Sequence, residues 1–314
     1  MDKFLSCDWG TSTFRLRLID AESLKILAGE RNDTGIAKTF KSWQEQGADT
    51  ETRQAFYYSV ITTAVQKISK QLHLDLGGIP IIASGMISSS IGMMELLYKE
   101  VPAAIDGADL IIKRLLIPAG DKELIIISGI KTNDDIIRGE ETKVIGCASF
   151  FNDDSNERLI IFPGTHPKHV IIQNNKITRF KTYMTGEFFD LFTRHSILAA
   201  SVEKNADFDK ASFKAGVENS LTGNLLQTAF GIRTNDILKK IPKESNYHYL
   251  SGLLIGTELK GLQNYKYPVY LCGSTDLVPY YKLACEVLEI SVVAEIDADE
   301  ALLSGQKQVY GFAS

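Results

Sequence analysis

Cysteine is scarce in this sequence, with four residues among 314. None of them stands in a C-x-x-C pair, and no His or Cys cluster has the spacing of zinc ligands. A disulfide framework and a structural zinc site are therefore not expected. Isolated cysteines in a chain without an export signal indicate buried thiols and a cytoplasmic location. The four are Cys7, Cys147, Cys272 and Cys285.

Long apolar runs and an excess of one charge are also missing. No run reaches the roughly 18 residues that cross a bilayer, and Asp2 and Asp8 come too early for the apolar core of a signal peptide. The 39 acidic and 34 basic residues leave a net charge of −5. This balance argues against a protein built to bind nucleic acid or an anionic membrane. We therefore expect no nucleic-acid or membrane partner.

Several well-known catalytic motifs are absent. The sequence contains no G-x-x-x-x-G-K-[ST], no G-x-G-x-x-G after a strand, no H-E-x-x-H and no G-x-S-x-G. A P-loop nucleotide hydrolase, a dinucleotide-binding domain, a zinc protease and an α/β-hydrolase are thus not expected. At roughly 150 residues per domain, the length suggests about two domains.

The pattern that is present is α/β. Helices are predicted at 50–72, from about 138 to 148, at 186–199, 208–230 and 245–263, from about 276, and at 298–310. Strands are predicted at 4–7, 14–19, 24–28, 80–83, 110–116, 124–127, 158–162, 168–172, 177–185, 268–272 and 291–294. A strand, a Gly-Thr turn and a second strand occur twice, at Gly10-Thr11 and at Gly164-Thr165. This repetition indicates a duplicated architecture.

The first of these turns carries groups that suit phosphates. Asp8 ends a strand, and Gly10 lets backbone N–H groups approach an anion closely. The hydroxyl groups of Thr11, Ser12 and Thr13 add hydrogen-bond donors. Because Mg²⁺ prefers one or two carboxylates together with phosphate oxygens, the segment suits a magnesium nucleotide. An ordinary β-hairpin turn would use the same residue types. Arg15 and Arg17, on the next strand, are expected to solvate its outer face.

Two later turns have a similar character. Gly164 and Thr165 are followed by His166 and Lys168, and a lysine can meet a phosphate as a point charge. Gly273, Ser274 and Thr275 lie between a strand and a helix, where a ligand can rest against backbone and a helix N-terminus. A solvated lysine and close helix–strand packing would explain the same residues. His73, His195 and His248 are expected to be structural or surface residues.

Arg138, Glu140 and Glu141 stand together at the start of a predicted helix. Adjacent carboxylates there are favourable partners of the helix dipole. A kinase that acts on a hydroxyl group also needs a carboxylate to accept the hydroxyl proton. The arginine can pair with an anionic group of a substrate.

Three phosphate-handling turns in this order, with an acid-bearing helix before the second, resemble the actin/Hsp70/sugar-kinase superfamily. Within it, five segments together resemble the 2-dehydro-3-deoxygalactonokinase family: residues 8–10, 138–142, 163–168, 184–187 and 250–256. With the third turn, the resemblance extends from residue 8 to residue 275. It implies two ribonuclease-H-like domains, residues 1–138 and 139–314, with a nucleotide cleft between them.

The resemblance also implies an activity: ATP-dependent phosphorylation of the 6-hydroxyl of 2-dehydro-3-deoxy-D-galactonate, in galactonate catabolism. Asp8 would organise Mg²⁺. The general base in such kinases is an acid shortly before the second phosphate motif, and both Glu140 and Glu141 match that place. Glu141 is preferred, because Glu140 could serve as a partner of the helix start. The nucleotide would be held by Asp8, Gly10, Thr11, Ser12, Thr13, Gly164, Thr165, His166, Lys168, Gly252, Gly256, Gly273, Ser274 and Thr275.

The implied substrate carries a carboxylate, so a cation or a cluster of N–H groups should face it. Arg138 and the loop with Gly85, Met86 and Ser88 are the candidates. His169 departs from the family pattern, which usually has an aromatic residue at this position after Lys168. Two alternatives remain: a kinase for a related sugar or sugar acid, and a nucleotide-switch ATPase of the same fold. The oligomeric state is open, with a homodimer among the options.

Overall fold

The computed structural model describes residues 1–47, 50–117, 122–151, 155–204 and 207–313. Its strands and helices confirm the expected α/β class. The chain divides into two compact units. Unit 1 comprises Met1–Asn152, Asn175–Arg179 and Ala298–Ser314, and unit 2 comprises Asp153–Asn174 and Phe180–Asp297. The expected domains 1–138 and 139–314 stay a prediction. Unit 1 as defined here also includes residues 139–152 and the last helix.

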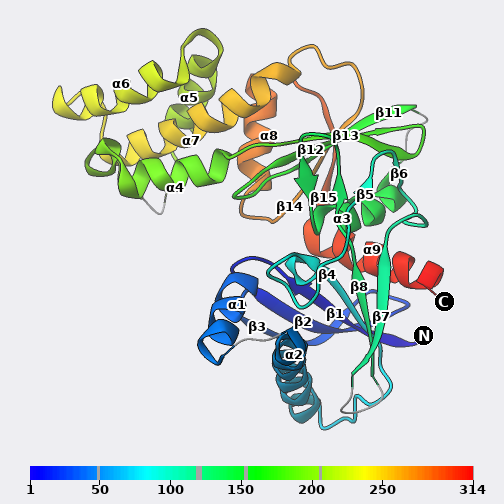
Figure 1. Ribbon diagram of the computed structural model, residues 1–314. Helices are drawn as coiled ribbons and strands as arrows, with labels where there is room; N and C mark the ends of the chain where they lie inside the picture. The colour runs from blue at the N-terminus through cyan, green and yellow to red at the C-terminus, as the bar shows by residue number, and fades with distance from the viewer. Residues whose placement is uncertain (48–49, 118–121, 152–154, 205–206, 314) are drawn as a thin grey trace. The chain divides into compact units, whose positions relative to one another are not determined.

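Unit 1 is built on a sheet with the strand order β3-β2-β1-β4-β8-β7 (Figure 1). β1 pairs antiparallel with β2, and β2 does so with β3. β4 runs parallel to β1 and β8 runs parallel to β4. The predicted strands are thus present, and their ends move by at most two residues, except that the strand predicted at 24–28 runs from Ile26 to Asn32. Their bounds are β1 (Lys3–Trp9), β2 (Phe14–Asp20), β3 (Ile26–Asn32), β4 (Ile81–Gly85), β7 (Ile112–Ile117) and β8 (Lys122–Ile127).

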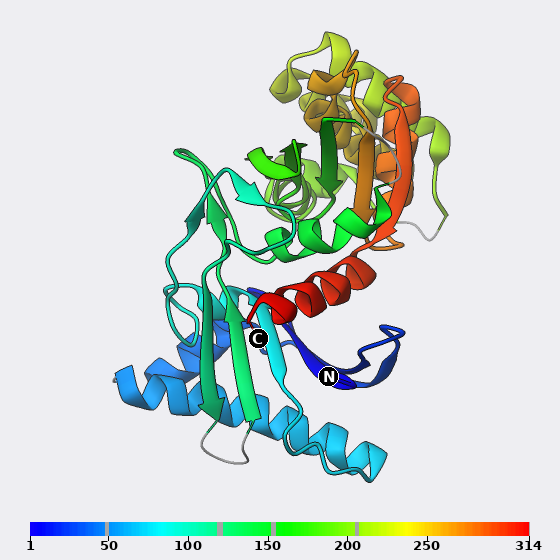
Figure 2. The same cartoon turned by 90° about the vertical axis from the view of Figure 1, so that its right-hand side faces the viewer.

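The alternation of side chains along β1 gives the sheet two different faces. Leu5, Cys7 and Trp9 belong to a buried cluster with residues of α2 (Thr50–Leu72), the helix predicted over the same residues. Asp8, between two of them, points to the opposite face. There Gln306 of α9 (Ala298–Ala313) donates to the Cys7 carbonyl and to the Ser84 hydroxyl. Figure 2 shows α2 and α9 on opposite sides of this sheet.

Two helices of unit 1 pack with almost no space between their backbones. A Cβ atom on Gly146 would lie 1.7 Å from the Ala301 carbonyl oxygen, and one on Gly305 would lie 1.9 Å from the Thr142 carbonyl oxygen. Glycine therefore allows α3 (Glu140–Cys147) to dock on α9. This packing fixes the place of the two adjacent glutamates. Unit 1 also contains α1 (Ile36–Glu45), η1 (Met86–Ser88), η2 (Ala148–Phe150), β5 (Lys99–Glu100), β6 (Ala103–Ala104), β9 (Ile130–Lys131) and β10 (Ile136–Ile137).

Unit 2 repeats the strand order of unit 1. Its strands follow as β13-β12-β11-β14-β15, the counterpart of β3-β2-β1-β4-β8. β11 pairs antiparallel with β12, whereas β14 and β15 continue in parallel. The expected duplication and the ribonuclease-H-like sheets are therefore confirmed. The bounds are β11 (Glu157–Phe162), β12 (Lys168–Gln173), β13 (Lys176–Thr182), β14 (Val269–Gly273) and β15 (Val292–Asp297). The start of β13 is grouped with unit 1, where it pairs with β6.

The helical part of unit 2 corrects two sequence predictions. The single helix expected at 208–230 is two helices, α5 (Lys210–Thr222) and α6 (Leu225–Ile237), because Asn224 caps a new helix by accepting from the Leu226 N–H. The strand expected to end at residue 185 ends at Thr182, and α4 (Thr185–His195) begins there. The other elements are α7 (Lys243–Leu259), α8 (Val278–Val287), η3 (Ile197–Ser201) and η4 (Lys260–Leu262).

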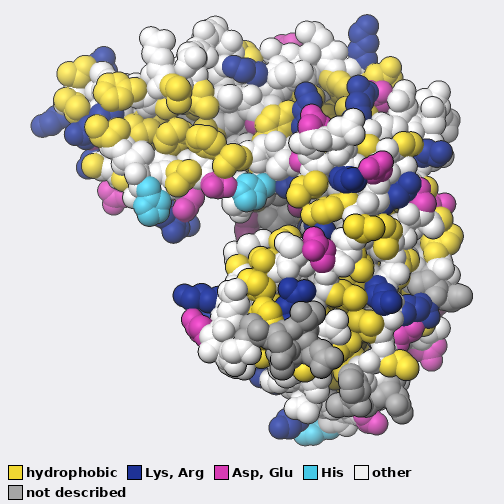
Figure 3. Space-filling model, in the orientation of Figure 1, with side chains coloured by type: hydrophobic (Ala, Val, Ile, Leu, Met, Phe, Trp, Pro, Cys, Tyr) yellow, Lys and Arg dark blue, Asp and Glu magenta, His cyan; other side chains and the backbone are white. Residues whose placement is uncertain are grey.

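The surface of this helical part is partly apolar. Figure 3 shows hydrophobic side chains gathered over it, and Leu226, Phe230 and Ile237 of α6 are all more than half exposed. All four cysteines of the chain are buried thiols, as the sequence predicts. Within the residues that the structure describes, no helix has both the length and the apolar character to cross a membrane.

Candidate functional site

In unit 1, three distant parts of the chain meet near Asp8. The parallel register sets Asp8 beside Ser84 and Trp9 beside Gly85, at the end of β4. A Cβ atom on Gly85 would lie 2.9 Å from the Trp9 carbonyl oxygen and 3.7 Å from Asp8 Oδ1. One on Gly139 would lie 3.3 Å from the Gly85 Cα atom. The predicted metal ligand, the predicted substrate loop and the start of α3 are thus neighbours.

The carboxylate of Asp8 is held by an arginine. Arg15 faces Asp8 across the hairpin, with Nη2 at 2.9 Å from Asp8 Oδ2. Asp299, at the start of α9, pairs with Arg15 at 3.3 Å and with Arg17 at 2.7 Å. The expectation that both arginines solvate the outer face of their strand is wrong, because Arg17 is buried and both pair with Asp299. No local pattern in the sequence indicates this partner.

The turn after β1 is held by the start of α1. The Gly10 N–H donates to the Thr13 carbonyl, while the Gly10 and Thr11 carbonyls accept from residues 36 and 37. A Cβ atom on Gly35 would lie 2.3 Å from the Ser12 carbonyl carbon, so this approach requires glycine. Thr11 and Ser12 remain exposed, and Gly10 and Thr13 are half-buried. The hydroxyl groups of this turn are therefore accessible to a ligand.

The two adjacent glutamates differ strongly in environment. Glu141 is fully buried, and its carboxylate accepts from the Gly139 N–H at 2.6 Å and from the Thr142 hydroxyl at 3.1 Å. Burial, followed by the nearby charge of Glu140, raises the pKa of Glu141 to about 7. Glu140 is half-buried. The pKa of Glu141 therefore suits proton transfer near neutral pH.

Arg138 is fixed against the loop that follows β4. Its Nη1 donates to the carbonyl and to the hydroxyl of Ser88, the latter at 2.6 Å. Its guanidinium group lies 4.1 Å from the centre of the Tyr98 ring. Ser88 is buried and also donates to the Ile127 carbonyl at 2.8 Å, whereas Met86, at the start of η1, is half-buried. The structure therefore brings together the residues predicted to hold the substrate carboxylate.

In unit 2, the turn between β11 and β12 lies against the start of α4. A Cβ atom on Gly186 would lie 2.6 Å from the Gly164 carbonyl oxygen, and the Glu187 N–H donates to the Thr165 carbonyl at 3.1 Å. A Cβ atom on Gly164 itself would meet nothing within 4 Å. Thr165 is exposed. This turn therefore offers open backbone that helix α4 holds in place.

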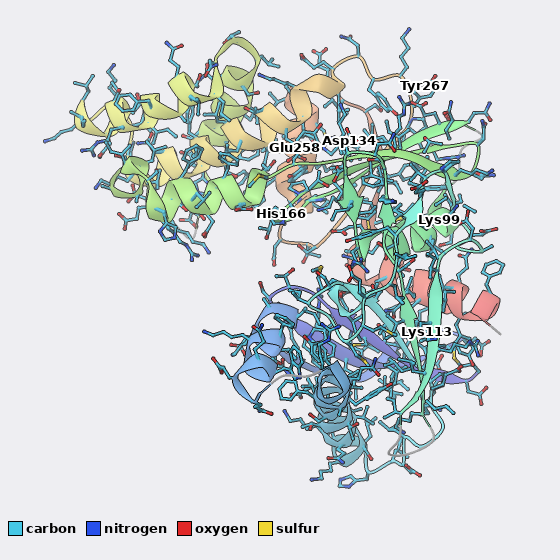
Figure 4. The ribbon with its side chains drawn as sticks, viewed as in Figure 1. Lys99, Lys113, Asp134, His166, Glu258 and Tyr267 are labelled. Atoms are coloured by element: carbon cyan, nitrogen blue, oxygen red, sulfur yellow. The ribbon has the colours of Figure 1, made fainter. Side chains whose placement is uncertain are left out.

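The histidine and the lysine of this turn have partners in the structure. His166, labelled in Figure 4, is exposed and places Nε2 at 2.5 Å from Glu187 Oε2. Lys168 is buried and donates to the His166 carbonyl at 2.6 Å. Phosphate contacts by these two side chains stay predictions.

A cavity of about 580 Å³ opens next to this turn. Helix α7 forms one wall with residues spaced three and four apart, which share one face of a helix. Aromatic side chains from α4, α7 and α8 complete it, as do residues that follow β14. His248, expected to be structural or at the surface, lies in this wall. The lining residues are Gly164, Thr185, Gly186, Phe189, Lys204, Tyr247, His248, Ser251, Leu254, Ile255, Asp276, Leu277, Tyr280 and Tyr281.

The glycines predicted to bind the nucleotide on α7 pack against another helix. A Cβ atom on Gly252 would lie 2.0 Å from the Phe213 carbonyl oxygen of α5, and one on Gly256 would lie 2.9 Å from the Val217 Cα atom. Both thus allow α5 and α7 to approach closely, while their chain neighbours Ser251 and Ile255 line the cavity. A nucleotide contact by either glycine stays a prediction. Sequence reasoning missed the residues of α7 that line the cavity, although their spacing of three and four positions predicts that they share one face of the helix.

The third turn begins with a buried glycine. A Cβ atom on Gly273 would lie 3.0 Å from Val278 Cγ2 and 3.2 Å from Pro163 Cδ, so β14 ends in close packing beside the second turn. Ser274 and Thr275 are exposed, and Asp276, next in the chain, lines the cavity. The second and third turns are therefore neighbours in unit 2.

The known proteins that this chain matches decide its family. A family model described as 2-keto-3-deoxy-galactonokinase matches residues 8–309. The chain belongs to this family. It is 32% identical over 316 residues to a probable 2-dehydro-3-deoxygalactonokinase from Rhizobium meliloti, covering 96% of this chain and 94% of that protein. It is 32% identical over 317 residues to the 2-dehydro-3-deoxygalactonokinase of Escherichia coli, covering 98% and 97%.

A solved structure supports the same assignment. The crystal structure of a putative 2-dehydro-3-deoxygalactonokinase from Sinorhizobium meliloti matches with a TM-score of 0.80 and 30% identity, over 98% of this chain and 95% of that one. Membership of the 2-keto-3-deoxy-galactonokinase family confirms the resemblance expected from the motifs. It also confirms the expectation of an enzyme, and specifically of a carbohydrate kinase. A nucleotide-switch ATPase is not favoured.

Proposed function

We propose that this protein transfers the γ-phosphoryl group of ATP to the 6-hydroxyl of 2-dehydro-3-deoxy-D-galactonate. The match to the 2-keto-3-deoxy-galactonokinase family over residues 8–309 is the observation that carries the proposal. The hydroxyl oxygen forms a bond to the γ-phosphorus, and the bond from that phosphorus to the β–γ bridging oxygen breaks. The hydroxyl proton passes to a general base, and ADP leaves. The expected binding partner is therefore this small-molecule sugar acid, and the expected location of the reaction is the cytoplasm.

Glu141 is the proposed general base. A pKa of about 7 keeps a large fraction of its side chain deprotonated at neutral pH and still allows it to hold a proton. Its bond to the Gly139 N–H places it next to Gly85, and so beside the end of β1 that carries Asp8. Glu140 is the second candidate, because its half-buried side chain is more accessible.

Asp8 is proposed to hold Mg²⁺ together with the phosphates of ATP. The described residues contain no group of three or more His, Cys, Asp or Glu side chains arranged for a metal ion. One carboxylate beside exposed hydroxyl groups nevertheless fits magnesium, which takes most of its ligands from phosphate and water. When bound, the ion would neutralise phosphate charge. Arg15, paired with Asp8, would keep this carboxylate oriented.

The cavity of unit 2 is proposed to take the adenosine of ATP. Its volume lies in the range of small-molecule sites. Tyr247, Tyr280 and Phe189 offer aromatic surface to a base, and the open backbone at Gly164 suits the phosphates. Arg138 is proposed to pair with the carboxylate of the sugar acid, because Ser88 and Tyr98 hold its guanidinium group in place.

The test is ADP release with magnesium and ATP, measured with 2-dehydro-3-deoxygalactonate and, separately, with its C4 epimer 2-dehydro-3-deoxygluconate. Fast turnover with the first substrate alone is expected. Arg138→Met should raise the KM for the sugar acid by about tenfold or more and leave the KM for ATP within about twofold. Turnover with neither sugar acid, with ATP hydrolysis retained, would exclude the proposed substrate.

A further inference from the structure

Unit 2 contains a buried carboxyl group that neither the family motifs nor the proposed reaction uses. Glu258, near the end of α7, has its side chain 1% exposed. Figure 4 shows it where the helical part of unit 2 adjoins the sheet. A carboxyl group is rarely buried this deeply unless several hydrogen bonds hold it. Its partners therefore indicate why it stands there.

Three side chains from three other elements converge on this group. Thr185, the first residue of α4, donates to Oε2 at 2.5 Å, and Tyr281 of α8 donates to the same oxygen at 2.7 Å. His169 of β12 places Nε2 at 2.9 Å from Oε1. Glu258 thus joins α4, α7, α8 and β12. His169 is the position at which the sequence departs from the usual aromatic residue, and its ring also packs on Tyr183 with 4.5 Å between ring centres.

Two of these partners line the cavity, whereas Glu258 does not. Thr185 and Tyr281 both belong to the wall. Thr185 also starts the helix whose next residue, Gly186, lies against the Gly164 carbonyl oxygen. The carboxyl group therefore holds the phosphate-facing turn and two wall residues in one arrangement, from behind the wall.

We propose that Glu258 is a positioning residue for nucleotide binding: through Thr185 and Tyr281 it fixes the start of α4, and with it the 163–167 turn, against the cavity. The proposal rests on the proposed function, because it takes the ligand of the cavity to be a nucleotide. A buried group with several partners is worth most when all of them are present. Loss of one bond should therefore loosen the wall rather than abolish the fold.

The experiment measures ADP binding by calorimetry without sugar acid, and then the KM values for ATP and for the sugar acid. Glu258→Gln, Thr185→Val and Tyr281→Phe should each raise the Kd for ADP and the KM for ATP by about tenfold. The KM for the sugar acid should stay within about twofold. Thr185→Ser keeps the hydroxyl group, so its Kd for ADP and its KM for ATP should both stay near the wild-type values.

Two variants serve as matched controls. Thr193→Val removes a hydroxyl group from the same helix, but one that donates only to the Phe189 and Asp190 carbonyls of α4. Glu286→Gln removes an exposed carboxylate of α8. Neither variant should change the Kd for ADP or the KM for ATP. In a protein that already carries Glu258→Gln, adding Thr185→Val should raise the Kd for ADP by less than about a further twofold, because both changes remove the same interaction.

Two outcomes would overturn the proposal. The first is unchanged ADP binding in the folded Thr185→Val and Tyr281→Phe proteins, which remain informative if Glu258→Gln does not fold. The second is an equal rise of the KM for ATP and the KM for the sugar acid, which a general loss of structure would produce. Failure of the proposed function looks different: the wild-type protein would then phosphorylate no sugar acid or bind no ADP.

Discussion

The β1–β2 hairpin of unit 1 and the β11–β12 hairpin of unit 2 occupy the same place in two sheets of the same strand order. Two residues before the turn glycine, unit 1 has Asp8 and unit 2 has the buried Phe162. Asp8 pairs with Arg15 on the facing strand. The facing strand carries Arg15 opposite Asp8 in unit 1 and the buried Lys168 opposite Phe162 in unit 2. One backbone design therefore places an acid–base pair at this point in unit 1, and a lysine facing an apolar side chain in unit 2.

Both turns are held by the start of a helix, but the helices differ in what else they do. The turn after β1 accepts N–H groups from the start of α1. The turn after β11 accepts the Glu187 N–H of α4, a helix that also lines the cavity. Unit 1 thus collects the proposed acid–base and metal chemistry, and unit 2 the proposed nucleotide binding. The three predictions below test this division, from the largest expected effect to the smallest.

Removing the proposed base should cause the largest change. Glu141→Gln should lower kcat by about 10²–10⁴-fold, and Glu140→Gln by less than about tenfold. Since the deprotonated form of Glu141 is active, kcat of the wild-type protein should rise as the pH rises through about 7. Glu140→Gln removes the like charge that raises this pKa, so its kcat profile should shift to lower pH.

The pH profiles and kcat values of both variants check this assignment. The reverse order, with the larger loss in Glu140→Gln, would make Glu140 the base. ADP binding measured without sugar acid is the control, and it should be the same in both variants.

Removing the charge that distinguishes unit 1 should have the next largest effect. Asp8→Asn keeps the size of the side chain and should lower kcat by about 10²-fold, because the proposed metal ligand is lost. ADP binding without metal should change little, since the cavity lies in unit 2. Asp33→Asn, which changes an exposed aspartate of unit 1, is the matched control. Near-normal turnover of Asp8→Asn would end the proposed metal role.

A smaller effect is expected from separating α4 and the second turn. Gly186→Ala places a Cβ atom 2.6 Å from the Gly164 carbonyl oxygen, so the turn must move. The KM for ATP should rise by about tenfold, with kcat changed less. Gly231→Ala on α6 meets nothing within 4 Å and should leave kinetics unchanged while stabilising its helix by up to about 1 kcal/mol. An equal KM for ATP in Gly186→Ala and Gly231→Ala would contradict the proposal that α4 holds the second turn in place for ATP.

Periodicity and turn residues were sufficient for much of the fold. Helix α2 runs over the residues predicted, and both hairpins form where the Gly-Thr turns stand. Short elements such as β5, β6, β9 and β10 have two residues each, too few to show a period. The helix predicted over 208–230 is interrupted because the cap at Asn224 outweighs the continuing apolar pattern.

The sequence by itself determined most of the longer elements, the α/β class and the candidate turns, because alternation, helical spacing and turn chemistry act over a few neighbouring residues; helix α1 (Ile36–Glu45) is a longer element that it did not predict. Only the tertiary structure decided which charges meet. Arg15 and Asp299 are separated by 284 positions, and Thr185 and Glu258 by 73. The same holds for the α7 glycines, which pack on α5 while their neighbours line a cavity. Contacts of this kind depend on how strands and helices are brought together, and no local pattern encodes them.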